Sequence, residues 1–230
     1  MRTVFYFCIG TTVASFACCC GYRLGKGQAP WSPRRSYCDN CGHLLASWQL
    51  IPILGWLLQG GHCHYCGNHI SVFLPTTEFL IGIAAVLLCN GSSYPMQLVY
   101  LLALATLTIL ACCDFFYCFV YPIFILGLLP LAFSHPLSWS ITEVGSAFFL
   151  LTIIFILVIK YQGLGSGDLY FLIMILIVLG FYPTIAIILL ASSATLLLIP
   201  FSNTKVPFIP GLAFATIIVL IYLKQKGALA

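Results

Sequence analysis

Two aspartates at the ends of apolar runs are the residues in this sequence best suited to chemistry. Asp114 ends the run LATLTILACCD, and Asp168 ends the loop GLGSGD and starts another apolar run. An ionisable group at the edge of a membrane-length apolar segment is costly, so it marks function more often than packing. Two carboxylates that approach each other share a proton, so one can take a proton from water while the other protonates a carbonyl oxygen. The pair therefore suggests peptide hydrolysis of the aspartic-protease kind.

The same two acids also fit a simpler interpretation, in which neither takes part in a reaction. Asp168 would then cap the helix that follows it, and Asp114 would be an ordinary loop residue. Gly165 and Gly167 allow close backbone approach beside Asp168, because glycine carries no Cβ, but a Gly-x-Gly pattern alone identifies no phosphate loop. Spacing within the sequence does not decide between a catalytic pair and this alternative.

Four cysteines form a second group with a chemically specific spacing. They lie in two Cys-x-x-Cys pairs, Cys38 with Cys41 and Cys63 with Cys66. Two such knuckles at this separation are the expected arrangement for tetrahedral coordination of a zinc ion by thiolates. Gly42 and Gly67 each follow a second cysteine, where a knuckle turn often needs a positive φ. The spacing predicts a structural Zn²⁺ site, with two disulfides or free thiols as the alternatives.

Four histidines near this motif offer further ligands. They are His43, His62, His64 and His69. Four thiolates already complete a closed tetrahedron, so we expect the histidines to be solvated and the site to have no open position for catalysis. A closed site stabilises a domain that is too small to be stable by burial alone. The eight other cysteines lie in apolar runs, where thiols behave as small hydrophobic side chains.

The overall composition places these residues in a membrane protein. Hydrophobic residues make up 62% of the 230 residues and charged residues only 6%, with a mean hydropathy of +1.10. Soluble domains carry about 25% charged residues. The net charge of +4 is modest and gives no indication of nucleic-acid binding. The composition therefore predicts an all-α polytopic protein whose surroundings are the lipid bilayer.

Apolar runs separated by polar or turn-forming residues predict about eight transmembrane helices. The first run, residues 3–22, is long and is followed by basic residues, which favours an uncleaved span over a cleaved signal peptide. The other runs are residues 72–89, 96–113, 119–133, 142–159, 169–181, 183–200 and 207–223. We therefore expect residues 1–22 to be the first helix and residues 23–71 a small four-cysteine loop domain. Residues 72–230 would form the membrane core that carries both aspartates.

The distribution of basic residues predicts which side faces the cytoplasm. Eight alternating spans place residues 23–71, Asp114 and Asp168 on one side. The basic residues of that side are Arg23, Lys26, Arg34, Arg35, Lys160 and Lys205, and those of the other side are Arg2, Lys224 and Lys226. The positive-inside bias then assigns the first side to the cytoplasm, where reducing conditions argue against disulfides.

The order of these features resembles the type IV prepilin peptidase family, membrane aspartic peptidases that also process competence pseudopilins. The likeness covers nearly the whole chain. Near the N-terminus, ASFACCCGYRL is similar to the family's Gly-Ser-Phe and arginine segment, with Ser15, Phe16 and Arg23 in register. The stretches SYCDNCGHLL and LIPILGWLLQGGHCHYCGNHIS match closely, and Glu78 stands where the family has a glutamate at the opening of the second span.

The resemblance extends over both aspartates. Asp114 is followed by Pro122, as the family's first catalytic aspartate is followed by a proline, and Gly165-Ser166-Gly167-Asp168 matches the family's Gly-x-Gly-Asp. The segment KVPFIPGLA at residues 205–213 is similar to the family's Pro-Phe-x-Pro element. The resemblance therefore implies that Asp114 and Asp168 are the catalytic pair, supported by the glycines of the second motif.

The resemblance also implies a substrate and a location. Relatives cut type IV prepilins or pseudopilins after a glycine of a short basic leader, at the cytoplasmic face of the bacterial inner membrane. Arg23 and Glu78 would be accessory residues that dock the leader or hold the loop. Relatives also methylate the new N-terminus with S-adenosylmethionine. Ala14 in place of glycine and Tyr170 in place of the common lysine leave methylation open here, as does Ser47-Trp48-Gln49 where many relatives carry an acid.

Two other classes of function fit parts of the sequence. A non-catalytic membrane assembly protein would use the zinc loop to bind partners and would tolerate replacement of both aspartates. A transporter would use the acids as proton relays, but it would need acids deep within its spans and an internal repeat, and neither stands out in the sequence.

Overall fold

The computed structural model describes residues 1–32, 35–134, 140–161, 165–198 and 207–227. Over these residues the fold is all-helical, as the composition predicts. The long helices are α1 (Arg2–Gly25), α3 (Phe73–Cys89), α4 (Tyr94–Tyr117), α6 (Ile141–Tyr161), α7 (Ser166–Leu179), α8 (Phe181–Leu198) and α9 (Ile209–Gln225). The short ones are η1 (Ser47–Leu50), α2 (Leu54–Leu58), α5 (Pro122–Ile125) and η2 (Leu126–Ser134). Arg34, Gly163 and Lys205 lie outside the described residues, as does the side chain of Lys160.

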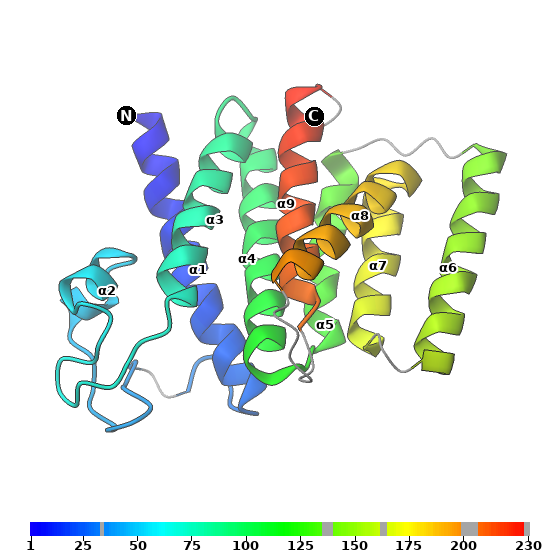
Figure 1. Ribbon diagram of the computed structural model, residues 1–230. Helices are drawn as coiled ribbons and strands as arrows, with labels where there is room; N and C mark the ends of the chain where they lie inside the picture. Colours follow the sequence, from blue (N-terminus) through cyan, green and yellow to red (C-terminus); the bar gives the residue numbers. More distant parts are fainter. Residues whose placement is uncertain (33–34, 135–139, 162–164, 199–206, 228–230) are drawn as a thin grey trace.

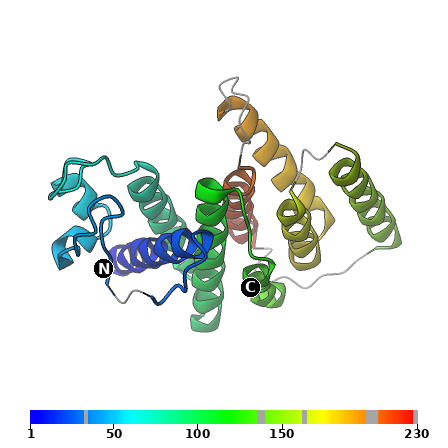
Figure 2. The same cartoon turned by 90° about the horizontal axis from the view of Figure 1, so that it is seen from below.

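The long helices stand side by side in a broad array, except α8, which runs obliquely to the others (Figure 1). The segment between α1 and α3, residues 26–72, forms a loop domain at one edge of the array, and α6 lies at the opposite edge (Figure 2). In Figure 1, α1 and α4 end toward the lower end of the array, where the loop domain lies at one edge, and α3, α7 and α9 begin toward the same end. This end of the array, called the loop end below, therefore gathers segments that are far apart in the sequence.

Small residues let α1 pack closely against its two neighbours. A Cβ added to Gly10 would lie 2.5 Å from the Cβ of Ala85 in α3, and one added to Gly21 would lie 2.6 Å from the carbonyl oxygen of Ile109 in α4. Ala14, between the two glycines, is fully buried. Helices in a membrane associate through van der Waals packing, and small residues let their backbones approach each other. The small face of α1 is thus the reason that it lies against α3 and α4.

Eight apolar helical segments occur in the described residues, one for each predicted run. Two of them, α1 and α4, are long and apolar enough by themselves to cross a membrane. The other six are shorter apolar helices, and they follow the predicted order along the chain. The all-α class is confirmed, and the number of eight crossings stays a prediction.

One predicted boundary is shifted by the chemistry of glycine and proline. The sequence places the break between the sixth and seventh runs at Tyr182-Pro183, but α7 ends at Leu179, before Gly180. Gly180 has φ 88°, a backbone conformation that glycine adopts without steric cost. Proline is tolerated in the first turn of a helix, so α8 begins at Phe181 and includes Pro183.

The run at residues 119–133 forms two short pieces where the sequence predicted one regular helix. α5 begins with Pro122, and the 3₁₀ helix η2 follows it directly and contains Pro130. Proline has no N–H to donate, so α-helical hydrogen bonding is interrupted at this residue. Gly127 lies against α4, where an added Cβ would be 2.4 Å from Oγ1 of Thr106. This irregular piece lies between α4 and α7 and contacts both of them.

Candidate active site and metal centre

Asp114 lies within α4, close to the end of the helix at the loop end of the array. The helix continues to Tyr117 and ends at Cys118, which has φ 48° and donates its N–H to the carbonyl oxygen of Asp114 over 2.8 Å. The carboxyl group is buried, with 8% of the residue exposed, and Oδ2 accepts a hydrogen bond of 3.1 Å from the backbone N–H of Ile209. The alternative in which Asp114 is a loop residue is therefore wrong.

Asp168 is the third residue of α7 and is buried to the same extent as Asp114. Its Oδ2 accepts a hydrogen bond of 2.9 Å from the N–H of Gly165, the residue before the helix. An acid in the first turn that binds the N-cap N–H satisfies a group that would otherwise have no partner in the helix. The predicted helix-capping role of Asp168 is thus present, and it occupies one carboxylate oxygen.

Gly167 brings the start of α7 against the segment that follows Asp114. A Cβ added to Gly167 would lie 3.0 Å from the Cβ of Val120, between α4 and α5. The 3₁₀ helix η2, which follows this segment, contacts both α4 and α7. The structure thus places the two acids at the same end of the array, on helices joined through one segment, while their action as a pair stays a prediction.

A third segment contributes to this pair through its backbone. Ile209 begins α9 within the sequence PFIPG, and its N–H is the donor to Asp114. The sequence shows the Pro-Phe-x-Pro resemblance in this segment but assigns it no contact. Proline at the second position of α9 suits the first turn of a helix, where N–H groups have no partner within the helix. One of these free N–H groups is the donor to the carboxylate.

The four cysteines lie in two turns of equivalent geometry within the loop domain. In each turn the first cysteine accepts, on its carbonyl oxygen, a hydrogen bond from the glycine after the second cysteine: Gly42 to Cys38 over 2.8 Å and Gly67 to Cys63 over 2.9 Å. Both glycines have positive φ, 70° and 69°, as the spacing predicts. An isolated antiparallel bridge closes each turn, Tyr37 with Leu44 and His62 with His69.

The cysteine side chains fit a structural zinc ion. The sulfur atoms of Cys38, Cys41, Cys63 and Cys66 all lie within 4.8 Å of one another. Two sulfurs bound at about 2.3 Å in a tetrahedron are about 3.8 Å apart, and Sγ of Cys38 lies 3.8 Å from Sγ of Cys66. The backbone N–H of Asn68 and the side-chain amide of Asn40 lower the pKa of the Cys66 thiol to about 6, which favours a thiolate at this position. The pKa of the Cys41 thiol is raised to about 11, with the neighbouring thiols of Cys38 and Cys66 among the causes.

The histidines of the loop domain lie outside this cluster, as predicted. All four side chains are exposed. The His43 ring stacks on Tyr65 with a centroid distance of 3.6 Å, and the rings of His62 and His69 meet edge to face. Their role in the described structure is ring packing on the surface of the domain.

A cavity of about 430 Å³ lies between α1, the loop domain and α3. Ser15, Arg23 and Glu78 all line it, although they come from separate positions in the sequence. Phe116, two residues after Asp114, lines it as well. The cavity therefore contains both predicted accessory residues and reaches the end of α4 that carries the first aspartate.

Hydrogen bonds show what the accessory residues do in this structure. Oε2 of Glu78 accepts a hydrogen bond of 2.7 Å from the N–H of Ile53, and the hydroxyl of Ser15 contacts the same carboxylate. Nη1 of Arg23 donates to the carbonyl oxygen of Pro30 over 2.8 Å. Both residues thus hold the loop domain against the helices. The sequence suggests this role for Glu78, but it does not indicate that Ser15 and Ile53 contact the Glu78 carboxylate.

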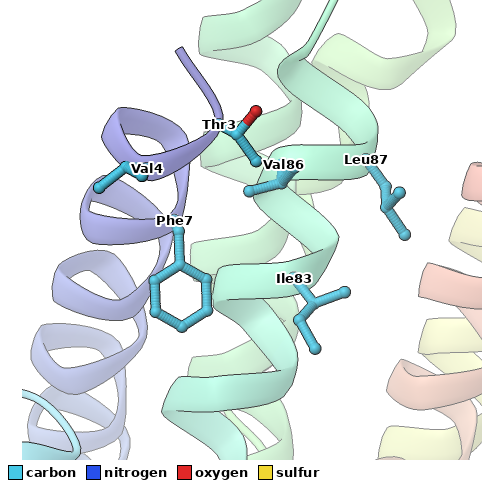
Figure 3. A pocket seen from close by; sticks show the side chains of 6 residues that line it. All are labelled: Thr3, Val4, Phe7, Ile83, Val86 and Leu87. Carbon is cyan, nitrogen blue, oxygen red and sulfur yellow. The ribbon is translucent and has the colours of Figure 1, made fainter. Parts of the chain in front are cut away.

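A second cavity, of about 300 Å³, lies between α1 and α3 (Figure 3). Its lining residues are Thr3, Val4, Phe7, Ile83, Val86 and Leu87. They belong to the start of α1 and the end of α3, away from the loop end. The lining offers no titratable group, so this cavity is unsuited to the chemistry of the aspartates.

Comparisons with known proteins agree with the features of this site. The profile of a family described as the Bacterial Peptidase A24 N-terminal domain matches residues 8–91. A protein of Bacillus subtilis named prepilin leader peptidase/N-methyltransferase is 28% identical over 232 residues, which cover 94% of this chain and 92% of that protein. The resemblance to the prepilin peptidase family is confirmed. This likeness implies a membrane protein.

Two further relatives carry the same name and match shorter parts. The one from Myxococcus xanthus is 36% identical over 106 residues, 46% of this chain and 31% of that protein. The one from Dichelobacter nodosus is 26% identical over 150 residues, 58% of this chain and 50% of that protein. In these two relatives the match spans half of the protein or less. No solved structure matches the chain.

The likeness to prepilin peptidases covers both parts of the site. The matched domain contains the four cysteines together with Ser15, Arg23 and Glu78, and it ends before Asp114. The alignment with the Bacillus subtilis relative covers 94% of the chain and therefore extends over the region of both aspartates. The cavity residues and the aspartates thus belong to one continuous similarity.

Proposed function

We propose that this chain is a membrane-embedded aspartic endopeptidase that removes the leader of type IV prepilins or competence pseudopilins. The observation that carries this proposal is that two buried carboxyl groups, Asp114 and Asp168, lie at the loop end on different helices, each held by a main-chain N–H. The names of the relatives support the peptidase activity and the substrate class.

The two aspartates would act on a water molecule between them. The ionised carboxylate takes a proton from the water while the protonated one donates to the carbonyl oxygen of the scissile peptide. The water oxygen bonds to the carbonyl carbon, and the tetrahedral intermediate then breaks its C–N bond as the amine accepts a proton. The N–H of Ile209 binds Oδ2 of Asp114, and the N–H of Gly165 binds Oδ2 of Asp168. In each aspartate Oδ1 is then the oxygen that would act on the water or the substrate.

The substrate would meet this pair at the cytoplasmic surface of the bacterial inner membrane. Both aspartates and the loop domain lie at the same end of the helix array (Figure 1). The excess of basic residues at this end supports a cytoplasmic location. A single-span prepilin with a short basic leader would present the glycine before its cleavage site at this level. Arg23 and Glu78 would support the reaction by fixing the loop domain beside the substrate path.

The loop domain would hold one structural Zn²⁺ ion through Cys38, Cys41, Cys63 and Cys66. The ion would join the two knuckles covalently, and four thiolates leave no open position for a reacting group. Its contribution is therefore to the stability of the domain and to the position of the cavity walls. The peptidase reaction itself requires only the two aspartates and water.

Methyl transfer to the new N-terminus is a second candidate activity. The relatives' names include it, and the cavity of about 430 Å³ beside Glu78 has the size of a small-molecule site such as S-adenosylmethionine would need. Ala14 and Tyr170 depart from the family pattern, so this activity is tested separately. Cleaved substrate and labelled S-adenosylmethionine would be mixed with the chain, and absence of label in the presence of cleavage would remove this candidate.

The peptidase proposal is tested by substitution of the paired acids. The chain would be co-expressed with a candidate prepilin, beside Asp114→Asn and Asp168→Asn, and leader removal would be followed by the mass of the substrate. Glu143→Gln is the matched control, because Glu143 caps the start of α6 and lies outside the site. We expect cleavage by the wild type and the control only, at equal membrane levels. Normal cleavage by either aspartate variant would refute the mechanism and favour the non-catalytic assembly protein.

A further inference from the structure

The loop domain exposes an unusual number of apolar side chains for an extramembrane segment. From Asn40 to Thr77 the chain contains no aspartate, glutamate, lysine or arginine. Within this stretch η1, Ile51 and α2 expose six large apolar residues. One is Trp48 (39% exposed), and the other five form what is called the α2 surface below. They are Leu50 (45% exposed), Ile51 (45%), Leu54 (54%), Leu57 (57%) and Leu58 (68%). A contiguous apolar surface of this kind marks contact with a partner or with a membrane.

The opposite side of α2 is fixed, so the leucines cannot turn inward. A Cβ added to Gly55 would lie 2.3 Å from the carbonyl oxygen of Gln49, which shows how closely this side packs. Trp56 points into the domain, where its Nε1 donates to the carbonyl oxygen of Ile70 over 3.1 Å. The exposure of Leu57 and Leu58 is therefore a consequence of how α2 is attached.

The hydrogen bond between Ile53 and Glu78 fixes the position of α2 along the axis of α3. Ile53 directly precedes α2, and Glu78 lies five positions after Phe73, the first residue of α3. At 1.5 Å per residue this is roughly 7–8 Å along the axis of α3. Helices that lie in the surface of a bilayer bury their apolar side about 5–10 Å into the boundary between headgroups and acyl chains. Figure 1 shows α2 beside α1 and α3 rather than beyond their ends. Figure 2, seen along the long helices, shows it at the edge of the array.

We propose that the α2 surface inserts into the cytoplasmic leaflet of the bilayer, with lipid acyl chains as its partner. This inference rests on the proposed placement of α1 and α3 in the membrane. α3 also exposes apolar side chains, among them Phe79 and Ile83, which are 49% and 38% exposed. Residues 26–72 also carry Lys26, Arg34 and Arg35 against a single acid, Asp39, which pairs with Lys26. The net positive charge suits anionic lipid headgroups. The loop domain is then anchored to lipid on one side and to Glu78 on the other.

Photo-crosslinking of the full-length chain in bilayer nanodiscs tests this contact. A benzophenone amino acid would replace Leu57, and the disc would contain phosphatidylcholine with phosphatidylglycerol. Ile83 in α3 is the positive control for lipid contact. Tyr65 is the control within the loop domain, because it is an exposed aromatic whose neighbours are His43 and His64. Adducts would be identified by the intact mass of the irradiated protein.

We expect lipid adducts at Leu57 in a yield similar to that at Ile83, and at least fivefold fewer at Tyr65. Adducts at Ile83 without adducts at Leu57 would overturn the inference and leave the membrane placement intact. No lipid adduct at Ile83 would instead overturn the membrane placement. A dimer-mass product at Leu57 in place of lipid adducts would identify a second copy as the partner, and equal lipid adducts at Leu57 and Tyr65 would show that the contact is not restricted to the α2 surface.

Discussion

The backbone N–H of Ile209 donates a hydrogen bond to Oδ2 of Asp114 over 3.1 Å and joins the start of α9 to the end of α4. Asp168 has the equivalent arrangement with Gly165 at the start of α7. In each case one carboxylate oxygen is held by a main-chain donor whose position depends on the fold. The direction of the second oxygen is then determined by the length of the aspartate side chain.

This geometry predicts that glutamate will not replace either aspartate. Asp114→Glu and Asp168→Glu keep the carboxyl group but extend it by one methylene, which displaces either the held oxygen or the reacting one. A misplacement of about 1 Å can reduce a rate about 100-fold, so we expect at least that loss in the rate of leader removal. The rate would be measured on purified chain in nanodiscs with a synthetic prepilin segment. Activity within tenfold of wild type in either variant would contradict a fixed pair.

The contact between Gly167 and Val120 predicts a second effect on activity. Gly167→Ala places a Cβ 3.0 Å from the Cβ of Val120, which pushes the start of α7 and Asp168 away from Asp114. Overpacking of this kind costs about 1–3 kcal/mol. We expect the rate of leader removal to fall about tenfold or more.

Two further variants show whether this loss comes from that contact. Gly145→Ala is the matched control, because Gly145 lies in α6, outside the site, and its added Cβ would meet no atom within 4 Å. Val120→Gly combined with Gly167→Ala should restore the rate, because glycine removes the Cβ that the new methyl group would contact. Failure of this rescue, with Gly145→Ala unaffected, would place the cause elsewhere.

The four-cysteine cluster predicts one bound zinc ion per chain. Cys38→Ser should abolish zinc content measured by elemental analysis and should increase proteolytic cutting within residues 26–72, because the two knuckles lose their link. His64→Ala is the matched control, since this exposed histidine lies outside the cluster and should leave zinc content unchanged. Zinc retained by the serine variant, or lost from the alanine variant, would contradict the assignment of ligands.

The parts of this molecule that residue type determines could be predicted from the sequence. Apolar runs gave the order of the helices, and the Cys-x-x-Cys spacing indicated both the cluster and the positive φ of Gly42 and Gly67. The contact between Ile209 and Asp114 could not be predicted in this way. Its donor is a main-chain N–H, a group present at almost every position, and 95 positions of sequence separate it from the acceptor. The fold alone decides which N–H meets the acid.

Ile53 shows a different limit, in which tertiary contacts overrule local preference. Its φ is 63° and its ψ −55°, a conformation that is rare for a β-branched residue. The N–H of the next residue, Leu54, binds the carbonyl oxygen of Pro52 over 2.6 Å, which makes a strained γ-turn. The N–H of Ile53 itself is held by Glu78. No local pattern predicts this turn, because the residue type opposes it and the stabilising group lies 25 positions away.

This turn predicts that glycine at position 53 gives a more stable loop domain than alanine, the reverse of the usual order of stability. Ile53→Ala and Ile53→Gly both remove the side chain, but alanine keeps the steric cost of the positive φ, about 1–2 kcal/mol, and glycine does not. Glycine normally lowers stability by about 0.5–1 kcal/mol relative to alanine through its larger unfolded-state entropy. We therefore expect the loop domain of Ile53→Gly to be the more stable of the two, by up to about 1.5 kcal/mol, measured from the rate of proteolysis within residues 26–72. Leu57 lies in α2, so Leu57→Ala should be more stable than Leu57→Gly. If Ile53→Ala were likewise more stable than Ile53→Gly, the strained turn would be absent.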